Sequence, residues 1–233
     1  MRDSLLTINI ISSCNQHCAY CPIPDKWKVP IGTDRKDVNI INNRDLIHWL
    51  KKWADPEKWF IEITGGEPGL YPEINTLLPL LESTGYKGLV KTNGSLPIIK
   101  CEAFPRISAW HNNDKPEYYD IICIIKNPAD DWESKAALCE MDKIPYGLVE
   151  FDDTPHGENR NKRAPEETRI FKNITHINSS GQITMCSRLK PDEGVTIWNS
   201  LPIENVTVRR PCLSCKNVYD VEIFYNLIYG GDK

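Results

Sequence analysis

Residues 12–24 read SSCNQHCAYCPIP and place three cysteines, Cys14, Cys18 and Cys21, within eight positions. This stretch follows LLTINIIS (5–12), a β-branched apolar run that predicts a buried strand. Four thiolates would close a tetrahedral zinc site or a simple iron–sulfur site. Three thiolates leave one position for another ligand. The sequence therefore predicts an open metal centre directly after the first strand.

The composition of the 233-residue chain is that of a globular protein, with 40% hydrophobic and 26% charged residues. A net charge of -4, with acids and bases mixed along the chain, argues against nucleic acid as the main partner. No apolar run approaches the ~20 residues that span a bilayer, and the N-terminus lacks the pattern of a signal peptide. We expect a cytoplasmic protein in which the clustered cysteines, among nine in all, serve metals rather than a disulfide framework.

Strand and helix patterns alternate up to residue 151. The strand patterns cover 5–12, 58–68, 87–95, 104–111, 118–127 and 145–151. The helix patterns cover 42–54, with Asn43 as the expected N-cap, 72–85, where Pro79 should kink or end the helix, and 129–143. Alternation of this kind predicts βαβ units and a parallel sheet. Six units fall short of the eight of a complete barrel, so we expect an α/β fold with a partial (β/α)6 TIM-type barrel over residues 1–151.

The composition of the sequence changes after this region. Residues 152–168 are polar, charged and proline-bearing, which predicts a linker or an exposed loop. Residues 175–188 pattern as a hairpin around Ser-Ser-Gly, and 218–230 pattern as an amphipathic helix. We therefore expect residues 169–233 to form a small β-hairpin plus helix module. Such a module is too small and polar to hold a large core, so a metal would help it to fold.

The segment CNQHCAYC (14–21) resembles the signature of radical S-adenosylmethionine (SAM) enzymes, including the aromatic Tyr20 before the last cysteine. Two further segments match that family in kind and order: Gly-Gly-Glu-Pro (65–68) after the second strand and Thr-Asn-Gly (92–94) after the third. The resemblance implies that the three cysteines hold a [4Fe–4S] cluster whose unique iron binds SAM. The alternative is a structural zinc knuckle completed by His17, which would not explain the glycine segment.

The resemblance also implies the residues that contact SAM. The two glycines would let the backbone approach the ligand, and Glu67 would accept a hydrogen bond from the SAM ammonium. Ser108 stands where the family places a polar contact on strand four, whereas Trp110 replaces the usual acidic residue there. The implied cofactor-binding residues are Tyr20, Gly65, Gly66, Glu67, Pro68, Thr92, Asn93, Ser108 and His111. The sequence names no catalytic residue.

A second group of cysteines, Cys186, Cys212 and Cys215, stands in GQITMCSR and PCLSC. This pattern resembles the accessory region called SPASM, or its shorter form called Twitch, and implies one auxiliary iron–sulfur cluster, expected as [4Fe–4S]. The fourth ligand is not predicted: the candidates are Cys101, His156, His176 and Asp220, or else the iron stays open and binds substrate. The alternative is a Cys3His zinc site.

The family chemistry implies an enzyme that cleaves SAM reductively to a 5′-deoxyadenosyl radical, which removes a hydrogen atom from its substrate. An auxiliary cluster favours oxidation or cross-linking of a small molecule or a peptide side chain, with flavodoxin or ferredoxin as the electron donor. The alternatives are a nucleobase- or tRNA-modifying radical SAM enzyme and a non-catalytic iron–sulfur or zinc module. The substrate is not predictable from the sequence.

Overall fold

The computed structural model describes residues 2–16, 40–109, 116–126, 131–150, 170–184, 195–196, 208–209 and 216–230. Its strands are β1 (Ser4–Ile11), β2 (Trp59–Gly65), β3 (Lys87–Thr92), β4 (Arg106–Ala109), β5 (Ile121–Lys126), β6 (Tyr146–Glu150), β7 (Asn173–Ile177), β8 (Gln182–Thr184), β9 (Val195–Thr196) and β10 (Val208–Arg209). Its helices are α1 (Asn43–Trp53), α2 (Ile74–Ser83), α3 (Trp132–Asp142) and α4 (Lys216–Tyr229), with short 3₁₀ turns η2 (Pro68–Leu70) and η4 (Pro116–Tyr118).

The strands form one sheet in the order β6-β5-β4-β3-β2-β1-β7-β8-β9, and β10 pairs with β7. Neighbouring strands from β1 to β6 are parallel, and α1 and α2 follow β1 and β2 as crossover helices. In the described residues the sheet has two ends and does not close on itself. The predicted α/β fold with a partial, TIM-type barrel is confirmed.

The predicted hairpin is also present, formed by β7 and β8. Its first arm, however, pairs in parallel with β1, with Thr7 opposite His176. The barrel sheet therefore continues into the part of the chain that the sequence assigned to a separate module. The boundaries at residues 151 and 168 stay predictions, since 151–169 lie outside the described residues.

Helices α1 and α2 form where the apolar spacing predicted them, with two local differences. Asn42, not Asn43, caps α1, because its side-chain oxygen accepts from the Asp45 N–H at 3.2 Å. Helix α2 continues through Pro79 to Ser83. Its leucine face is fully buried, and this burial offsets the backbone hydrogen bond that proline cannot make.

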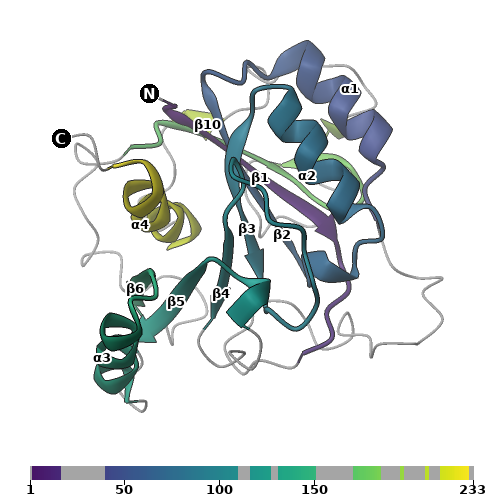
Figure 1. Ribbon diagram of the computed structural model, residues 1–233. Coiled ribbons are helices and arrows are strands. Elements are labelled where there is room, and N and C mark those ends of the chain that lie inside the picture. Colours follow the sequence, from purple (N-terminus) through teal and green to yellow (C-terminus); the bar gives the residue numbers. More distant parts are fainter. Residues whose placement is uncertain are drawn as a thin grey trace.

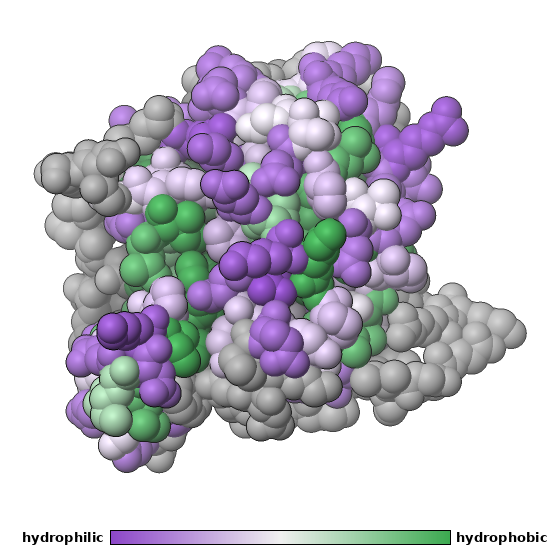
Figure 2. Space-filling model, in the orientation of Figure 1, coloured by the Kyte–Doolittle hydropathy of each residue, from purple (hydrophilic) through white to green (hydrophobic). Residues whose placement is uncertain are grey.

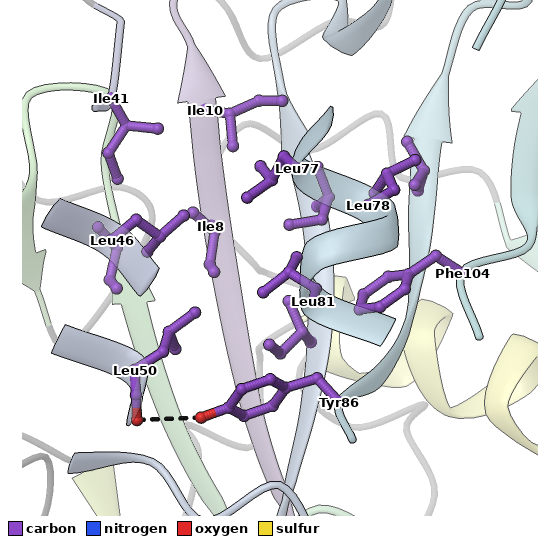
Figure 3. Packing of buried hydrophobic residues seen from close by; sticks show 14 of the residues in the cluster. Ile8, Ile10, Ile41, Leu46, Leu50, Leu77, Leu78, Leu81, Tyr86 and Phe104 are labelled. Carbon is purple, nitrogen blue, oxygen red and sulfur yellow. Dashed lines mark hydrogen bonds between the residues drawn. The ribbon is translucent and has the colours of Figure 1, made fainter. Parts of the chain in front are cut away.

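The outer face of the sheet, defined as the face that α1 and α2 cover, packs a large aliphatic core (Figure 1). Ile8 and Ile10 of β1 point between Leu46 and Leu50 of α1 and the leucines of α2 (Figure 3). The Tyr86 hydroxyl donates to the carbonyl of Leu50 at 3.0 Å, which ties the start of β3 to α1. Two crossover helices are thereby fixed against the first three strands.

The inner face, defined as the opposite face, packs against α4 (Figure 1). Phe224 of α4 is 1% exposed and joins Leu5, Phe60 and Leu89 in one apolar cluster. Gly147 of β6 makes room for it, because a Cβ there would stand 2.6 Å from the Phe224 ring. Apolar side chains gather over α4 in Figure 2, whereas the surface over α1 and α2 is mostly hydrophilic. No helix among the described residues is long and apolar enough to cross a membrane.

Candidate functional site

Cys14 lies just beyond the carboxyl end of β1, where the next two strands also end. It is 7% exposed, and two backbone hydrogen bonds from the end of β2 fix the segment that leads into it. The Gly66 N–H donates to the carbonyl of Ile11 at 2.8 Å, and the Glu67 N–H donates to the carbonyl of Ser13 at 2.8 Å. These bonds continue the β1–β2 pairing past both strands. The predicted cysteine segment and the Gly-Gly-Glu-Pro segment are therefore side by side.

Gly65 and Gly66 make this close pairing possible. Gly65 has a φ of 137°, and a Cβ there would stand 2.4 Å from the Ile11 carbonyl oxygen. A Cβ on Gly66 would stand 1.8 Å from the Ser13 carbonyl oxygen. Contacts this short exclude any side chain. The glycines bring the β2 end against the backbone that leads into Cys14, and their approach to a bound ligand stays a prediction.

Glu67 is fully buried and joins the end of β2 to the end of β3. Its Oε1 accepts from Thr92 Oγ1 at 2.6 Å and from the Gly69 N–H at 2.7 Å, and its Oε2 accepts from the Asn93 N–H at 2.6 Å. Burial raises the pKa of Glu67, and these three hydrogen bonds oppose the rise. Pro68 is buried and begins η2. Glu67 thus holds the Thr-Asn-Gly turn in place, and its contact with a SAM ammonium stays a prediction.

Asn93 connects that turn to the cysteine segment. Its Nδ2 donates to Asn15 Oδ1 at 2.7 Å and lies 3.8 Å from Cys14 Sγ. Asn15 in turn donates to Ser95 Oγ at 2.8 Å, and the Ser95 N–H donates to Asn93 Oδ1 at 3.0 Å. Sequence reasoning did not single out Asn15 and Ser95. The signal was available, because the Asn-Gly-Ser order favours side-chain-to-backbone turns of this kind.

Ser108 of β4 is fully buried and stands next to the same turn. It is in register with Thr92 of β3, and a Cβ on Gly94 would lie 2.8 Å from its hydroxyl. The φ of 68° at Gly94 also requires glycine. Four adjacent strands therefore end around Cys14, Glu67, Thr92 and Ser108. A direct contact of Ser108 with SAM stays a prediction.

Several predicted site residues lie outside the described residues, so the structure does not place them: Cys18, Tyr20, Cys21, His111, Cys186, Cys212 and Cys215. Among the described residues, no group of three or more histidine, cysteine or acidic side chains could hold a metal. Three candidates for the fourth auxiliary ligand lie among the described residues, and one of them, Asp220, is on α4. Cys101 belongs to the outer core, where burial raises the pKa of its thiol to about 11, and His176 is buried on β7.

Cys14 is the one expected cluster ligand among the described residues, and its surroundings suit a [4Fe–4S] cluster. A nearly buried thiol stands where the carboxyl ends of parallel strands converge, which is where barrel folds place their active sites. The amide of Asn93 lies close enough to the Cys14 sulfur to orient it or to donate a hydrogen bond to it. The sequence supplies two more cysteines within the next seven positions. Thiolates are the ligands of such clusters.

Comparison with known proteins supports the same assignment. Residues 8–109 match the model of the radical SAM superfamily. Over 86 residues the chain is 35% identical to 7-carboxy-7-deazaguanine synthase of Methanothermobacter thermautotrophicus, covering 37% of this chain and 32% of that protein. Over 96 residues it is 29% identical to GTP 3′,8-cyclase of Vibrio vulnificus strain YJ016, covering 41% of this chain and 28% of that protein. The matched segment thus spans about a third of each relative.

A solved structure matches over nearly the whole chain. Streptococcus suis SuiB, crystallised with S-adenosylmethionine, aligns with a TM-score of 0.59 over 98% of this chain and 68% of its own. The sequence identity is 13%, so this likeness concerns the fold. Family match, relatives and fold agree with the geometry around Cys14. The matching segment, residues 8–109, is that of a radical SAM domain.

Proposed function

We propose that this chain is a radical SAM enzyme acting on a small-molecule substrate. The observation that carries the proposal is the position of Cys14, which Gly66 and Asn93 hold at the carboxyl ends of β1, β2 and β3. A structural cysteine would not need the ends of three strands to be joined around it by a buried carboxylate and an amide network. The matched family supplies the class of chemistry.

Cys14, Cys18 and Cys21 would hold the [4Fe–4S] cluster together with SAM. When bound, this cofactor pair supplies a 5′-deoxyadenosyl radical that removes a hydrogen atom from the substrate. The chain's own part is to position the cofactor and the substrate and to exclude water. Glu67 fixes the turn after β3, Asn93 fixes the backbone around Cys14, and α4 covers the far end of the inner face. A reduced flavodoxin or ferredoxin would supply the electron.

Oxidation or cross-linking of the substrate is the finer form of the proposal. Cys186, Cys212 and Cys215 would hold an auxiliary iron–sulfur cluster that accepts an electron from the substrate. The support for this step is the spacing of these cysteines in the sequence. A reducing, cytoplasmic location would keep all of these thiols available for iron.

A second candidate function is the modification of a nucleobase-like heterocycle. The observation that favours it is the pair of relatives whose names concern 7-carboxy-7-deazaguanine and GTP, both guanine-type compounds that carry an anionic group. Because the match spans about a third of each relative, the substrate of the whole protein is not transferred with it. The two candidates share the radical step and differ in the substrate.

The test is anaerobic reconstitution with measurement of iron, sulfide, the EPR spectrum and 5′-deoxyadenosine. Two [4Fe–4S] clusters would require roughly eight irons. The triple variant Cys14→Ala/Cys18→Ala/Cys21→Ala should lose about half of the iron and all SAM cleavage. The variant Cys186→Ala/Cys212→Ala/Cys215→Ala should lose the other half. The matched control Cys139→Ala, on α3 and in an apolar cluster, should keep the iron and the SAM cleavage of wild type. Wild-type protein that binds iron but forms no 5′-deoxyadenosine would refute the proposal.

A further inference from the structure

The inner face of the barrel sheet changes from apolar to polar along three adjacent strands. Leu5, Phe60 and Leu89 belong to the cluster packed with α4. Side chains two positions apart share a face of a strand, so Thr7, Glu62 and Lys91 follow them on the inner face. Each of the three is one step closer to the carboxyl end, where Cys14 and Gly66 lie. A polar layer, formed by Thr7, Glu62 and Lys91, thus lies between the apolar cluster packed with α4 and the candidate site.

The members of this layer contact one another. The Lys91 ammonium lies 2.6 Å from Glu62 Oε1, and Thr7 Oγ1 donates to Glu62 Oε2 at 2.7 Å. Glu62 is 1% exposed, and each of its oxygens already has a donor. Lys91 keeps 28% of its side chain exposed. The carboxylate is therefore closed to a ligand, whereas part of the Lys91 side chain is still exposed.

His176 completes the layer without adding a charge. It is in register with Thr7 on β7 and is 3% exposed. Burial lowers its pKa to about 4, and the nearby charge of Glu62 opposes this only in part. At neutral pH the imidazole is uncharged. Among these four residues, Lys91 is the cation, and its side chain is partly exposed.

Lys91 is also close along the chain to Asn93, the residue that contacts the cysteine segment. It precedes Thr92 and Asn93, and Asn93 Nδ2 lies 3.8 Å from Cys14 Sγ. Lys91, two positions before Asn93, is thus the last residue of β3 on the inner face. A small molecule that reaches from the candidate site toward α4 would meet this ammonium.

We propose that Lys91, held in place by Glu62 and Thr7, binds an oxyanion of the substrate, a carboxylate or a phosphate. The inference rests on the proposed function, since it needs a small-molecule substrate in the barrel. A buried anion requires a paired cation and hydrogen-bond donors, and an ammonium carries three N–H groups. Glu62 fixes the direction of the ammonium, so that less side-chain freedom is lost when the ligand binds.

The test measures binding to reconstituted protein with SAM, by calorimetry or equilibrium dialysis under anaerobic conditions. The probes are 7-carboxy-7-deazaguanine with its uncharged counterpart 7-deazaguanine, and GTP with guanosine. Lys91→Met keeps an unbranched side chain one atom shorter and removes its charge. It should weaken the carboxylate or the phosphate probe about tenfold or more and leave the uncharged counterpart unchanged. Which probe responds identifies the source of the oxyanion.

Two variants keep the result interpretable. Lys91→Met/Glu62→Gln removes both charges, avoids a lone buried carboxylate and should show the same selective loss. Lys87→Met, at the other end of β3 where the ammonium lies over the Tyr229 ring, should bind as wild type does. Wild-type protein that binds neither charged probe better than its counterpart, or equal losses for both members of a pair, would overturn the inference. Formation of 5′-deoxyadenosine by wild type in the same preparation tests the proposed function separately.

Discussion

Thr92 Oγ1 donates to Glu67 Oε1 at 2.6 Å, and both side chains are buried. This bond joins two segments that lie 25 positions apart in the sequence. The turn after β3 carries Asn93, which reaches the cysteine segment, so the bond fixes the third strand end relative to the first. The chain's own hydrogen bonds thereby stabilise the candidate site from within the barrel.

Replacing Glu67 by glutamine should lower the free energy of unfolding by about 2–3 kcal/mol. Oε1 of glutamine can keep the Thr92 and Gly69 donors, but its amide nitrogen would face the Asn93 N–H, another donor. Urea denaturation of the purified chain measures the loss. The control is Glu57→Gln, whose side chain is 82% exposed and which should change stability by less than about 0.5 kcal/mol. Equal losses in the two variants would contradict a structural role for Glu67.

Gly66→Ala should destabilise the protein by at least about 2 kcal/mol, because its Cβ would stand 1.8 Å from the Ser13 carbonyl oxygen. Separation of the two segments would break the hydrogen bond from the Glu67 N–H and displace Cys14. The comparison is Gly85→Ala, which has a φ of 86° but no atom closer than 3.7 Å. That variant should lose only about 1 kcal/mol from backbone strain. Equal decreases in the urea midpoints of Gly66→Ala and Gly85→Ala would show that the contact between Gly66 and Ser13 is not rigid.

Asn93→Ala should cost only about 1 kcal/mol of stability, because Asn93 is half-buried, but it should release iron about tenfold more readily. The amide orients the cysteine segment through Asn15 and lies near Cys14 Sγ. Iron retained by reconstituted protein after incubation with a chelator gives the readout. Asn75→Ala serves as the control, since Asn75 accepts one backbone hydrogen bond on the exposed side of α2. Iron retention unchanged from wild type would remove Asn93 from the site.

Much of this site follows from local sequence. Apolar spacing locates β1, β2 and β3, and the carboxyl ends of adjacent parallel strands must meet at one edge of the sheet. Cys14, Gly66 and Asn93 are therefore brought together by fold class alone. The Asn15–Asn93–Ser95 network needed atomic geometry, because the same residues would also suit isolated turns.

Other features depend on contacts that no local pattern encodes. The pairing of β7 with β1 joins segments about 170 positions apart, and the hairpin pattern of 175–188 says nothing of its partner strand. Glu62 and Lys91 are charged residues in strands, and alternation alone cannot tell an inner face from a solvent face. The N-cap is Asn42 and not the expected Asn43, because either asparagine can accept a hydrogen bond at a helix start. An error of one position is usual for a helix boundary.

Phe224→Ala should destabilise the chain by about 3–5 kcal/mol, because the ring fills the inner face between β6 and the first three strands. Leu227→Ala on the same helix is the control, with 46% of its residue exposed and an expected cost below about 1 kcal/mol. Thermal or urea unfolding followed by circular dichroism distinguishes them. A small loss for Phe224→Ala would mean that α4 does not form part of the barrel core.

His176 should make the protein sensitive to mild acid. Its pKa is lowered by burial from the ordinary 6.5 to about 4, so between these values the unfolded chain binds a proton that the folded chain does not. Stability contributed by the neutral imidazole is therefore complete above pH 6.5 and is lost as the pH falls toward 4, by up to about 3 kcal/mol. The variant His176→Phe should lack this part of the pH dependence whatever its absolute stability.

Urea unfolding of wild type and variant at pH 7, 6, 5 and 4.5 gives the difference that isolates His176 from the carboxylates titrating in the same range. His48→Phe, on the exposed face of α1, should keep the wild-type slope. Parallel curves for wild type and His176→Phe would mean that the imidazole can take up a proton beside Glu62 without unfolding. The polar layer would then carry two cations at acid pH, and binding of an oxyanion there should strengthen below pH 6.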